Sequence, residues 1–341
     1  MPVQSRRNRA LQRLSGALRP ARRPARDAEG APRRRLALVV PVFNEAAVLP
    51  EFLRRARAAL DALPYDWRIT FIDDGSSDET PRMLDGFASA DPRVRVLTLS
   101  RNFGQQIAIS AGIDRTRADA LIVCDADLQD PPETIPALVA LWERGFEVVH
   151  TVRTRREGES RFKQLSAALF YQLMCRLSGV ALPENAGDFK LIDRQVARIL
   201  RRMPEPHRYL RGMIAWTGFR QARLEYCRPP RLAGCSKYPL RKMLRLALDS
   251  LVSFSILPLR LATFVGAAAG LASLAGLAWV LFAKLAWKST LTGWASLMTV
   301  MLLLGGVQLL TVGILGEYLG RAFQQGKHRP LYVLRCRGGG S

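Results

Sequence analysis

Residues 36–45 read LALVVPVFNE, a β-branched apolar run that ends in polar side chains. Similar short runs follow at 68–72, 94–99 and 120–124. Longer stretches with helical periodicity alternate with these runs, at 45–63, 78–90, 104–117 and 132–144. Because strands that alternate with helices form a parallel sheet covered by helices, we expect an α/β fold whose ligands bind at the carboxyl ends of the strands.

Polar clusters follow the first two runs: PVFNE at 41–45 and DDGSSD at 73–78. Aspartates at a strand end can accept hydrogen bonds from a nucleotide base and from ribose hydroxyls, and the small residues after them let the backbone approach a ligand. The second cluster has a simpler alternative, which is to cap the following helix through Ser77 or Asp78. The two clusters together form a candidate nucleotide site.

A third cluster, DADLQDPPE at 125–133, follows the fourth run. Asp125 and Asp127 are two residues apart, which in an extended chain places both carboxylates on the same side. Paired carboxylates at a packed strand end are costly unless they meet a cation. Oxygen ligands without histidine or thiolate favour Mg²⁺ or Mn²⁺ over zinc. A solvated acidic loop is the alternative interpretation.

Together with SRNFG at 100–104, these motifs in this order resemble the family 2 glycosyltransferases. Within that family they resemble the polyprenyl phosphate branch, which includes bactoprenol glucosyltransferase and dolichol phosphate mannose synthase. The resemblance extends from about residue 36 to residue 332. It implies a GT-A catalytic domain, with a Rossmann-like and mostly parallel sheet, at 35–235. Phe43 stands where relatives often have tyrosine, which removes a hydroxyl but keeps a ring.

The resemblance also implies a donor site and a metal site. The implied ligands for Mg²⁺ or Mn²⁺ are Asp127 and Gln129. The metal would neutralise the diphosphate of a nucleotide sugar as the anomeric bond breaks. The residues implied to bind that donor are Pro41, Phe43, Glu45, Asp73, Asp74 and Asp125.

The implied catalytic residues are Asp125, Asp127 and Asp188. An acceptor phosphate is already largely dianionic at neutral pH, with a second pKa of about 6, so it hardly needs a general base. Asp188 is therefore expected to position groups or stabilise charge. The alternative for Asp188 is a buried structural ion pair with Lys190 or Arg194.

The resemblance also implies an acceptor-phosphate site, in the segment between the catalytic core and the membrane. Arginine can hold two phosphate oxygens at once, which favours specific binding. Interchangeable contacts with anionic headgroups are the alternative. The candidate residues are Arg211, Arg228, Arg231, Ser236 and Lys237.

The implied reaction is inverting transfer of a sugar from a nucleotide donor to polyprenyl (undecaprenyl) phosphate. UDP-glucose is the leading donor, and UDP-GlcNAc, a UDP-linked aminoarabinose and GDP-mannose remain alternatives because single hydroxyl contacts decide the sugar. A processive polysaccharide synthase is disfavoured because no Q-x-x-R-W segment follows the core. A non-catalytic membrane scaffold of the same fold is a further alternative.

The last third of the chain predicts a transmembrane hairpin. Residues 261–283 and 294–316 are uncharged, and at about 1.5 Å per residue each can cross a hydrocarbon core of ~30 Å. Basic residues are denser on the two outer flanks than in the link, so the positive-inside rule predicts both flanks, and the catalytic domain, on the cytoplasmic side of the inner membrane. Two buried core helices are the alternative. An amphipathic juxtamembrane helix is expected at 236–260, and a cytoplasmic tail at 317–341.

The formal charge of +22 favours partners with anionic lipid or phosphate groups. Residues 1–34 hold much of the arginine and are expected to form a disordered basic tail. Nucleic-acid binding is disfavoured because aromatic residues do not interleave with these basic residues. Five scattered cysteines without a C-x-x-C pair indicate no disulfide framework and a reducing compartment. We also expect a homo-oligomer.

Overall fold

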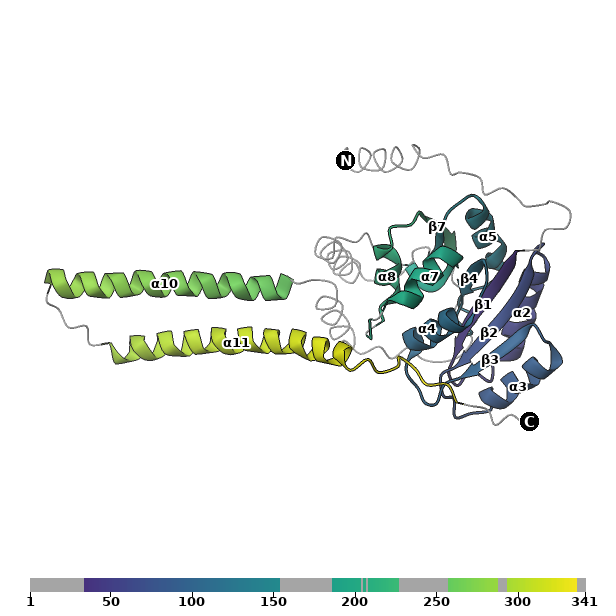
Figure 1. Cartoon of the computed structure of the whole chain (residues 1–341), viewed down its shortest axis with the longest axis horizontal. Coiled ribbons are helices and arrows are strands. Elements are labelled where there is room, and N and C mark those ends of the chain that lie inside the picture. Colours follow the sequence, from purple (N-terminus) through teal and green to yellow (C-terminus); the bar gives the residue numbers. More distant parts are fainter. Residues whose placement is uncertain are drawn as a thin grey trace, which may run out of the picture.

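The structure is a computed structural model that describes residues 34–153, 186–203, 205–206, 208–226, 257–287 and 293–335. An α/β domain occupies the described residues up to 226, and two long helices project from it as a hairpin (Figure 1). The predicted basic tail up to residue 33 and the predicted amphipathic helix up to residue 256 lie outside the described residues.

The sheet has seven strands in the order β3-β2-β1-β4-β6-β5-β7. β6 runs antiparallel to both of its neighbours, whereas the other recorded pairings are parallel. This confirms the mostly parallel α/β sheet expected from the sequence. The strands are β1 Arg35–Val42, β2 Asp66–Asp73, β3 Val94–Thr98, β4 Ala120–Val123, β5 Val148–Arg153, β6 Ala186–Asp193 and β7 Gln221–Tyr226.

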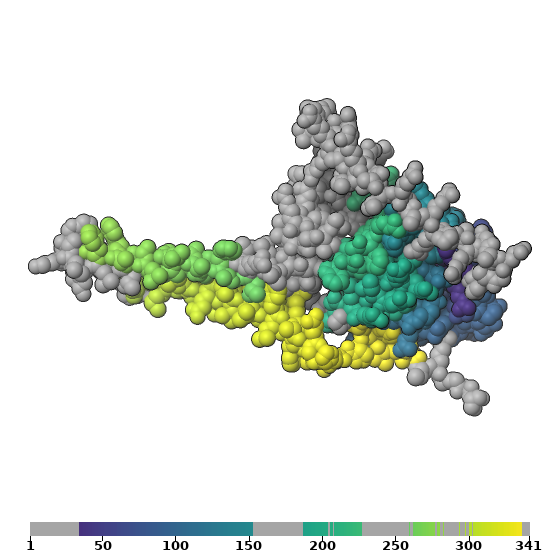
Figure 2. Space-filling view, turned by 45° about the horizontal axis from the view of Figure 1, so that its top comes forward, coloured from purple at the N-terminus to yellow at the C-terminus, as the bar shows by residue number. Residues whose placement is uncertain are grey.

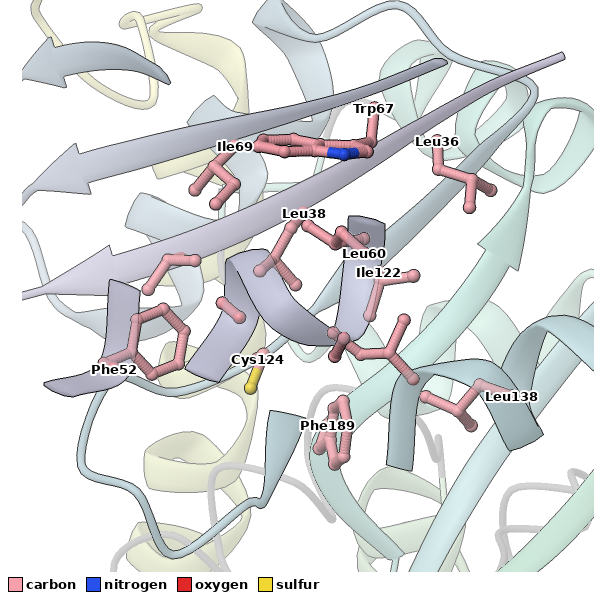
Figure 3. Packing of buried hydrophobic residues seen from close by; sticks show 14 of the residues in the cluster. Leu36, Leu38, Phe52, Leu60, Trp67, Ile69, Ile122, Cys124, Leu138 and Phe189 are labelled. Atoms are coloured by element: carbon pink, nitrogen blue, oxygen red, sulfur yellow. The ribbon is translucent and has the colours of Figure 1, made fainter. Parts of the chain in front are cut away.

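Helices cover both faces of this sheet because side chains alternate between faces along each strand. On β1, Leu36 and Leu38 pack in one cluster with Phe52 of α2, as Figure 3 shows. Ala37 and Val39 pack in a second cluster with α4, α7 and α8. The helices of the domain are α2 Leu49–Asp61, α3 Thr80–Ala90, α4 Gln105–Arg115, α5 Ile135–Glu143, α7 Arg194–Arg202 and α8 Leu210–Trp216, with a 3-10 turn η1 at Pro132–Thr134.

Several helices begin later than the periodicity predicts. The first was expected from residue 45, but α2 begins at Leu49. Residues 46–48 form a turn before it, and the backbone N–H of Glu45 donates to Thr80 Oγ1 at the start of α3. α4 packs very closely on the sheet, where a Cβ at Gly112 would lie 2.3 Å from Val39 Cγ1. Only glycine fits there.

The hairpin consists of α10 Leu257–Trp287 and α11 Trp294–Gly326, which lie side by side (Figures 1 and 2). Both helices extend beyond the apolar runs at 261–283 and 294–316. Within the described residues, Leu303–Gly326 is the one segment long and apolar enough to cross a membrane, and a shorter apolar segment covers Ala262–Gly276. Many large apolar side chains of both helices are exposed. This surface is suited to lipid rather than water.

The chain after α11 returns to the α/β domain, and we call residues 328–335 the return segment. Leu334 forms an antiparallel bridge with Leu99. The N–H of Ser100 donates to the carbonyl of Val333 at 2.9 Å, and the N–H of Arg335 donates to the carbonyl of Thr98 at 2.8 Å. The expected tail at 317–341 therefore begins as helix, and part of it pairs with the edge of the sheet beside β3.

Candidate active site

The strand ends bring the polar clusters to one edge of the sheet. Val42 pairs with Asp73 and Val39 pairs with Val123, so the loops that follow β1, β2 and β4 leave side by side. β6 enters this edge from the opposite direction, with Lys190 paired to Val123. Asp188 therefore lies beside the start of the third acidic cluster.

Reciprocal hydrogen bonds hold the first two loops together. The N–H of Asn44 donates to Ser76 Oγ at 3.0 Å, and the N–H of Ser77 donates to Asn44 Oδ1 at 2.9 Å. Asn44 has φ of +55°, a left-handed conformation that asparagine tolerates better than most residues. Phe43 precedes it with 44% of its surface exposed, so its ring is accessible to a ligand.

Asp73 and Asp74 are both buried but have different partners. Asp73 Oδ1 accepts from the N–H of Ser76 at 2.9 Å, and its buried Oδ2 has no hydrogen-bond partner among the described residues. Both oxygens of Asp74 accept from the backbone, from the N–H groups of Phe103 and Gly104 at 2.7 and 2.9 Å. Burial raises the pKa of Asp74, and these hydrogen bonds oppose that rise. Asp74 therefore ties the SRNFG loop to β2, while Asp73 keeps an oxygen for another donor.

The DADLQD loop has a geometry that suits a divalent cation. Leu128 is buried with φ of +59°, a strained conformation for leucine that places Asp127 and Gln129 on either side of a tight turn. Asp127 Oδ1 accepts from the N–H of Gln129 at 3.1 Å. The amide oxygen Oε1 of Gln129 is buried and has no hydrogen-bond partner in the described part of the chain.

These donors fit Mg²⁺ or Mn²⁺ shared with a substrate better than a closed protein site. No group of three or more His, Cys, Asp or Glu side chains close enough to hold a metal occurs among the residues that the structure describes. Magnesium commonly takes one or two protein oxygens and completes its shell with water and phosphate oxygens. Asp127 and Gln129 supply oxygens of that kind.

Asp125 lies in a strongly negative environment. Burial, with repulsion from Asp130, Asp188 and Asp127, raises the pKa of Asp125 to about 7, against a hydrogen bond from Gln105. That bond joins Gln105 Nε2 to Asp125 Oδ1 at 2.8 Å. A cation or a substrate hydroxyl near Asp125 would relieve this repulsion.

Two hydrogen bonds and an ion pair hold Asp188 in place. Arg211 Nε and Lys190 Nζ lie 3.1 and 3.7 Å from its Oδ1, and Gln106 Nε2 donates to its Oδ2 at 3.1 Å. Burial alone would raise the pKa of Asp188, but attraction to Lys190 and Arg211 holds it below its usual value. The alternative ion pair with Arg194 does not form, since Arg194 pairs with Asp119 at 3.6 Å.

The structure thus places donor, metal and catalytic candidates at one edge, with Arg211 beside them. Arg228, Arg231, Ser236 and Lys237 lie outside the described residues. Sequence reasoning missed Gln105 and Gln106, although both directly follow the SRNFG motif at the start of a helix. It offered Lys190 only as a structural alternative, because nothing in the sequence shows that β6 pairs with β4.

Comparisons with known proteins identify the family of the chain. The chain matches the family model of glycosyl transferase family 2 over residues 37–200 and that of the GtrB C-terminal hairpin over residues 257–322. The uncharacterized glycosyltransferase YkcC of Bacillus subtilis (strain 168) is 43% identical over 87% of this chain and 92% of its own length. The bactoprenol glucosyl transferase of Shigella phage SfV is 39% identical over 88% of this chain and 98% of its own.

A more distant likeness exists to a solved structure of glucosyl-3-phosphoglycerate synthase from Mycobacterium tuberculosis. It is 18% identical, with a TM-score of 0.44, over 65% of this chain and 80% of that one. The sequence relatives are sufficient to assign the class, which is a glycosyltransferase with an α/β catalytic domain and a C-terminal hairpin. The chain belongs to glycosyltransferase family 2 and is an enzyme homologous to the bactoprenol glucosyl transferases.

Proposed function

We propose that this enzyme transfers glucose from UDP-glucose to undecaprenyl phosphate, with inversion at the anomeric carbon. The observation that carries the proposal is the meeting of a carboxylate, Asp188, and a cation, Arg211, with the Asp125–Gln129 loop at one sheet edge. Relatives named for glucosyl transfer to bactoprenol, at 39% identity over nearly their whole length, support the sugar and the acceptor.

Donor binding is proposed for Pro41, Phe43, Glu45, Asp73, Asp74 and Asp125. The exposed ring of Phe43 can stack on a base, and the unpartnered buried oxygen of Asp73 can accept from a base N–H or a hydroxyl. Asp74 acts by fixing the SRNFG loop through its two backbone hydrogen bonds. Mg²⁺ or Mn²⁺ held by Asp127 and Gln129 would neutralise the donor diphosphate.

Acceptor binding is proposed for Arg211 together with Arg228, Arg231, Ser236 and Lys237. Arg211 is partly exposed, and its guanidinium contacts an oxygen of Asp188. A phosphate oxygen can take the place of that carboxylate oxygen. The test asks whether binding needs a guanidinium, which can hold two phosphate oxygens at once. In Arg231→Lys, we expect lost activity and a higher requirement for lipid phosphate, with donor affinity unchanged. Wild-type behaviour, or a defect in donor binding, would contradict this assignment.

The hairpin is proposed to anchor the enzyme in the inner membrane as two spans, with the catalytic domain and the chain after α11 in the cytoplasm. The exposed apolar side chains of α10 and α11 support anchoring, and the basic flanks support the orientation. In a cysteine-free background, Ser289→Cys should react with an impermeant reagent from the periplasm and Gln324→Cys only after lysis. The opposite pattern would contradict this orientation. We also propose that the enzyme forms a homo-oligomer.

The identity of the sugar is tested with a panel of labelled donors. Membranes that contain the enzyme and undecaprenyl phosphate are incubated with UDP-glucose, UDP-GlcNAc, UDP-linked aminoarabinose or GDP-mannose. We expect labelled lipid from UDP-glucose only. Lipid labelled from a different donor would keep the reaction and correct the sugar, and no labelled lipid from any donor would contradict the proposed function.

A further inference from the structure

Two cations converge on a single carboxylate oxygen at the active edge. Lys190 and Arg211 both approach Asp188 Oδ1, at 3.7 and 3.1 Å, while Gln106 binds Oδ2. One cation is enough to neutralise one carboxylate. Asp188 would therefore still face one cation if the other turned to a second anion.

The two cations differ in how freely they can move. The side chain of Arg211 is 30% exposed, whereas that of Lys190 is 3% exposed and that of Asp188 is 11% exposed. Lys190 Nζ is buried without a hydrogen-bond partner in the described residues, and it forms an ion pair with Asp188 there. Arg211 can rotate toward solvent, but Lys190 has no comparable path.

The surroundings of Lys190 make its contact with Asp188 strong. A small cavity beside the two side chains is lined otherwise by aliphatic residues, namely Ile109, Ile113, Val123, Ile192, Leu210 and Ile214. Attraction between charges is larger in such a poorly polarisable environment than at the surface. On the neighbouring strand β5, His150 is the cross-strand partner of Lys190. Burial, and then repulsion from Lys190, lowers the pKa of His150 to about 4, so this neighbour is uncharged at neutral pH.

We propose that Lys190 is a positioning residue that keeps Asp188 charged and in place while Arg211 turns from Asp188 to the acceptor phosphate. This inference rests on the proposed function, because it assigns Arg211 to that phosphate. Asp188 then releases one of its two cations without becoming an unpaired buried charge. The energetic cost of Arg211 leaving is lowered, and the carboxylate geometry at the reacting edge is preserved.

The charge of Lys190 can be titrated, which supplies a test. Burial lowers the pKa of Lys190 to about 8, against attraction from Asp188. The other charged groups that face this pair are Arg211 on α8 and Asp125 after β4. As pH rises through about 8, Lys190 loses its proton and its attraction for Asp188. Acceptor use should therefore fall on the alkaline side.

The experiment measures kcat/KM for undecaprenyl phosphate in detergent from pH 6 to 10, with saturating UDP-glucose and Mg²⁺. For the wild type, this kcat/KM should fall above pH ~8. Lys190→Arg keeps the charge at all these pH values, so its profile should stay flat beyond that point. In Lys190→Met, kcat/KM for undecaprenyl phosphate should be about tenfold or more below the wild-type value at pH 7, and the alkaline decline should be absent. Its KM for UDP-glucose should change less than about twofold.

His150→Leu is the matched control, since it disturbs the same buried layer without removing a charge from Asp188. It should lower thermal stability but keep the alkaline decline. A wild-type profile that stays flat to pH 10 would overturn the inference, even if no variant can be purified. Lys190→Met with full acceptor use, or Lys190→Arg with the wild-type decline, would also overturn it. If the wild type transfers no sugar at all, the proposed function fails instead.

Discussion

The polar edge of the sheet and the helical hairpin are stabilised by different means. At the edge, buried carboxylates accept hydrogen bonds from backbone and side-chain donors, such as those around Asp74 and Asp188. In the hairpin, large apolar side chains of α10 and α11 point outward and remain exposed. The position of each group therefore matters at the edge, whereas in the hairpin apolar character and length matter most. The return segment connects these two regions.

The largest expected effect on activity comes from removing one charge at the edge. Asp127→Asn replaces an anionic oxygen ligand by a neutral amide, which binds Mg²⁺ or Mn²⁺ poorly. We expect transfer to fall by about 100-fold or more, with the enzyme still folded and membrane-bound. Turnover is measured with labelled UDP-glucose, and membrane association by sedimentation. Near-normal turnover in this variant, or undiminished turnover in excess chelator, would remove the metal from the mechanism.

The same substitution should have a large effect on stability in one region and a small effect in the other. Leu38 is fully buried in the sheet core, and Leu309 on α11 is 74% exposed. Leu38→Ala should cost about 2–5 kcal/mol of unfolding free energy. Leu309→Ala should change it by less than about 0.5 kcal/mol. Both are measured by denaturant unfolding in detergent. A large loss for Leu309→Ala would show that a protein surface, rather than lipid, covers that face of the hairpin.

Repulsion among the crowded carboxylates at the edge should lower the free energy of unfolding. The pKa of Asp125 is raised to about 7 in the folded state, so the folded protein binds a proton there that the unfolded chain has already released. Stability is therefore lost as pH rises from about 4 to about 7. In chelator at pH 8, Asp125→Asn should stabilise the enzyme by about 1–3 kcal/mol, with little effect near pH 4.

Thermal unfolding at both pH values checks this prediction, and the transfer assay should show an inactive protein. The direction of the stability change is the informative result. If Asp125→Asn destabilises the enzyme at pH 8, the carboxylate is stabilised by its surroundings, and the repulsion assigned to Asp130, Asp188 and Asp127 is wrong.

The smallest expected effect concerns the link between the two regions. Leu334 of the return segment packs against the domain, whereas the side chain of Val333 is exposed. Leu334→Asp should weaken the pairing beside Thr98 and Ser100, just before the SRNFG loop. We expect a stability loss of about 1 kcal/mol and a rise of a few fold in the KM for UDP-glucose. Val333→Asp is the control and should change neither. Equal effects of the two substitutions would mean that the side-chain packing is unimportant.

Much of the edge could be predicted because each motif directly follows an apolar strand. The runs before Phe43, Asp73 and Asp125 fix those positions, since parallel strands end at the same edge. The positions of Asp188 and Lys190 were harder to predict, because they lie on β6, an antiparallel strand from much later in the chain that inserts beside β4. The left-handed turn at Leu128 could not be predicted either, since leucine rarely adopts a positive φ.

In the hairpin, the apolar runs predicted two helices but not their ends. A continuous apolar stretch has no capping residues or amphipathic period to mark a boundary. Both helices therefore extend beyond the runs, and α11 continues past Gly316 to Gly326. The return segment was not anticipated, although residues 331–334 are a short β-type run, because a single short run does not indicate which strand it pairs with.

The central claim is inverting transfer of glucose from UDP-glucose to a lipid phosphate at this edge of the sheet. The most direct measurement is the anomeric configuration of the product made by the purified enzyme from UDP-glucose and undecaprenyl phosphate, determined by NMR. Because the donor is the α-anomer, inversion predicts a β-linked glucosyl phosphate lipid. An α-linked product would contradict inversion, and release of free glucose without a lipid product would contradict transfer to the lipid phosphate.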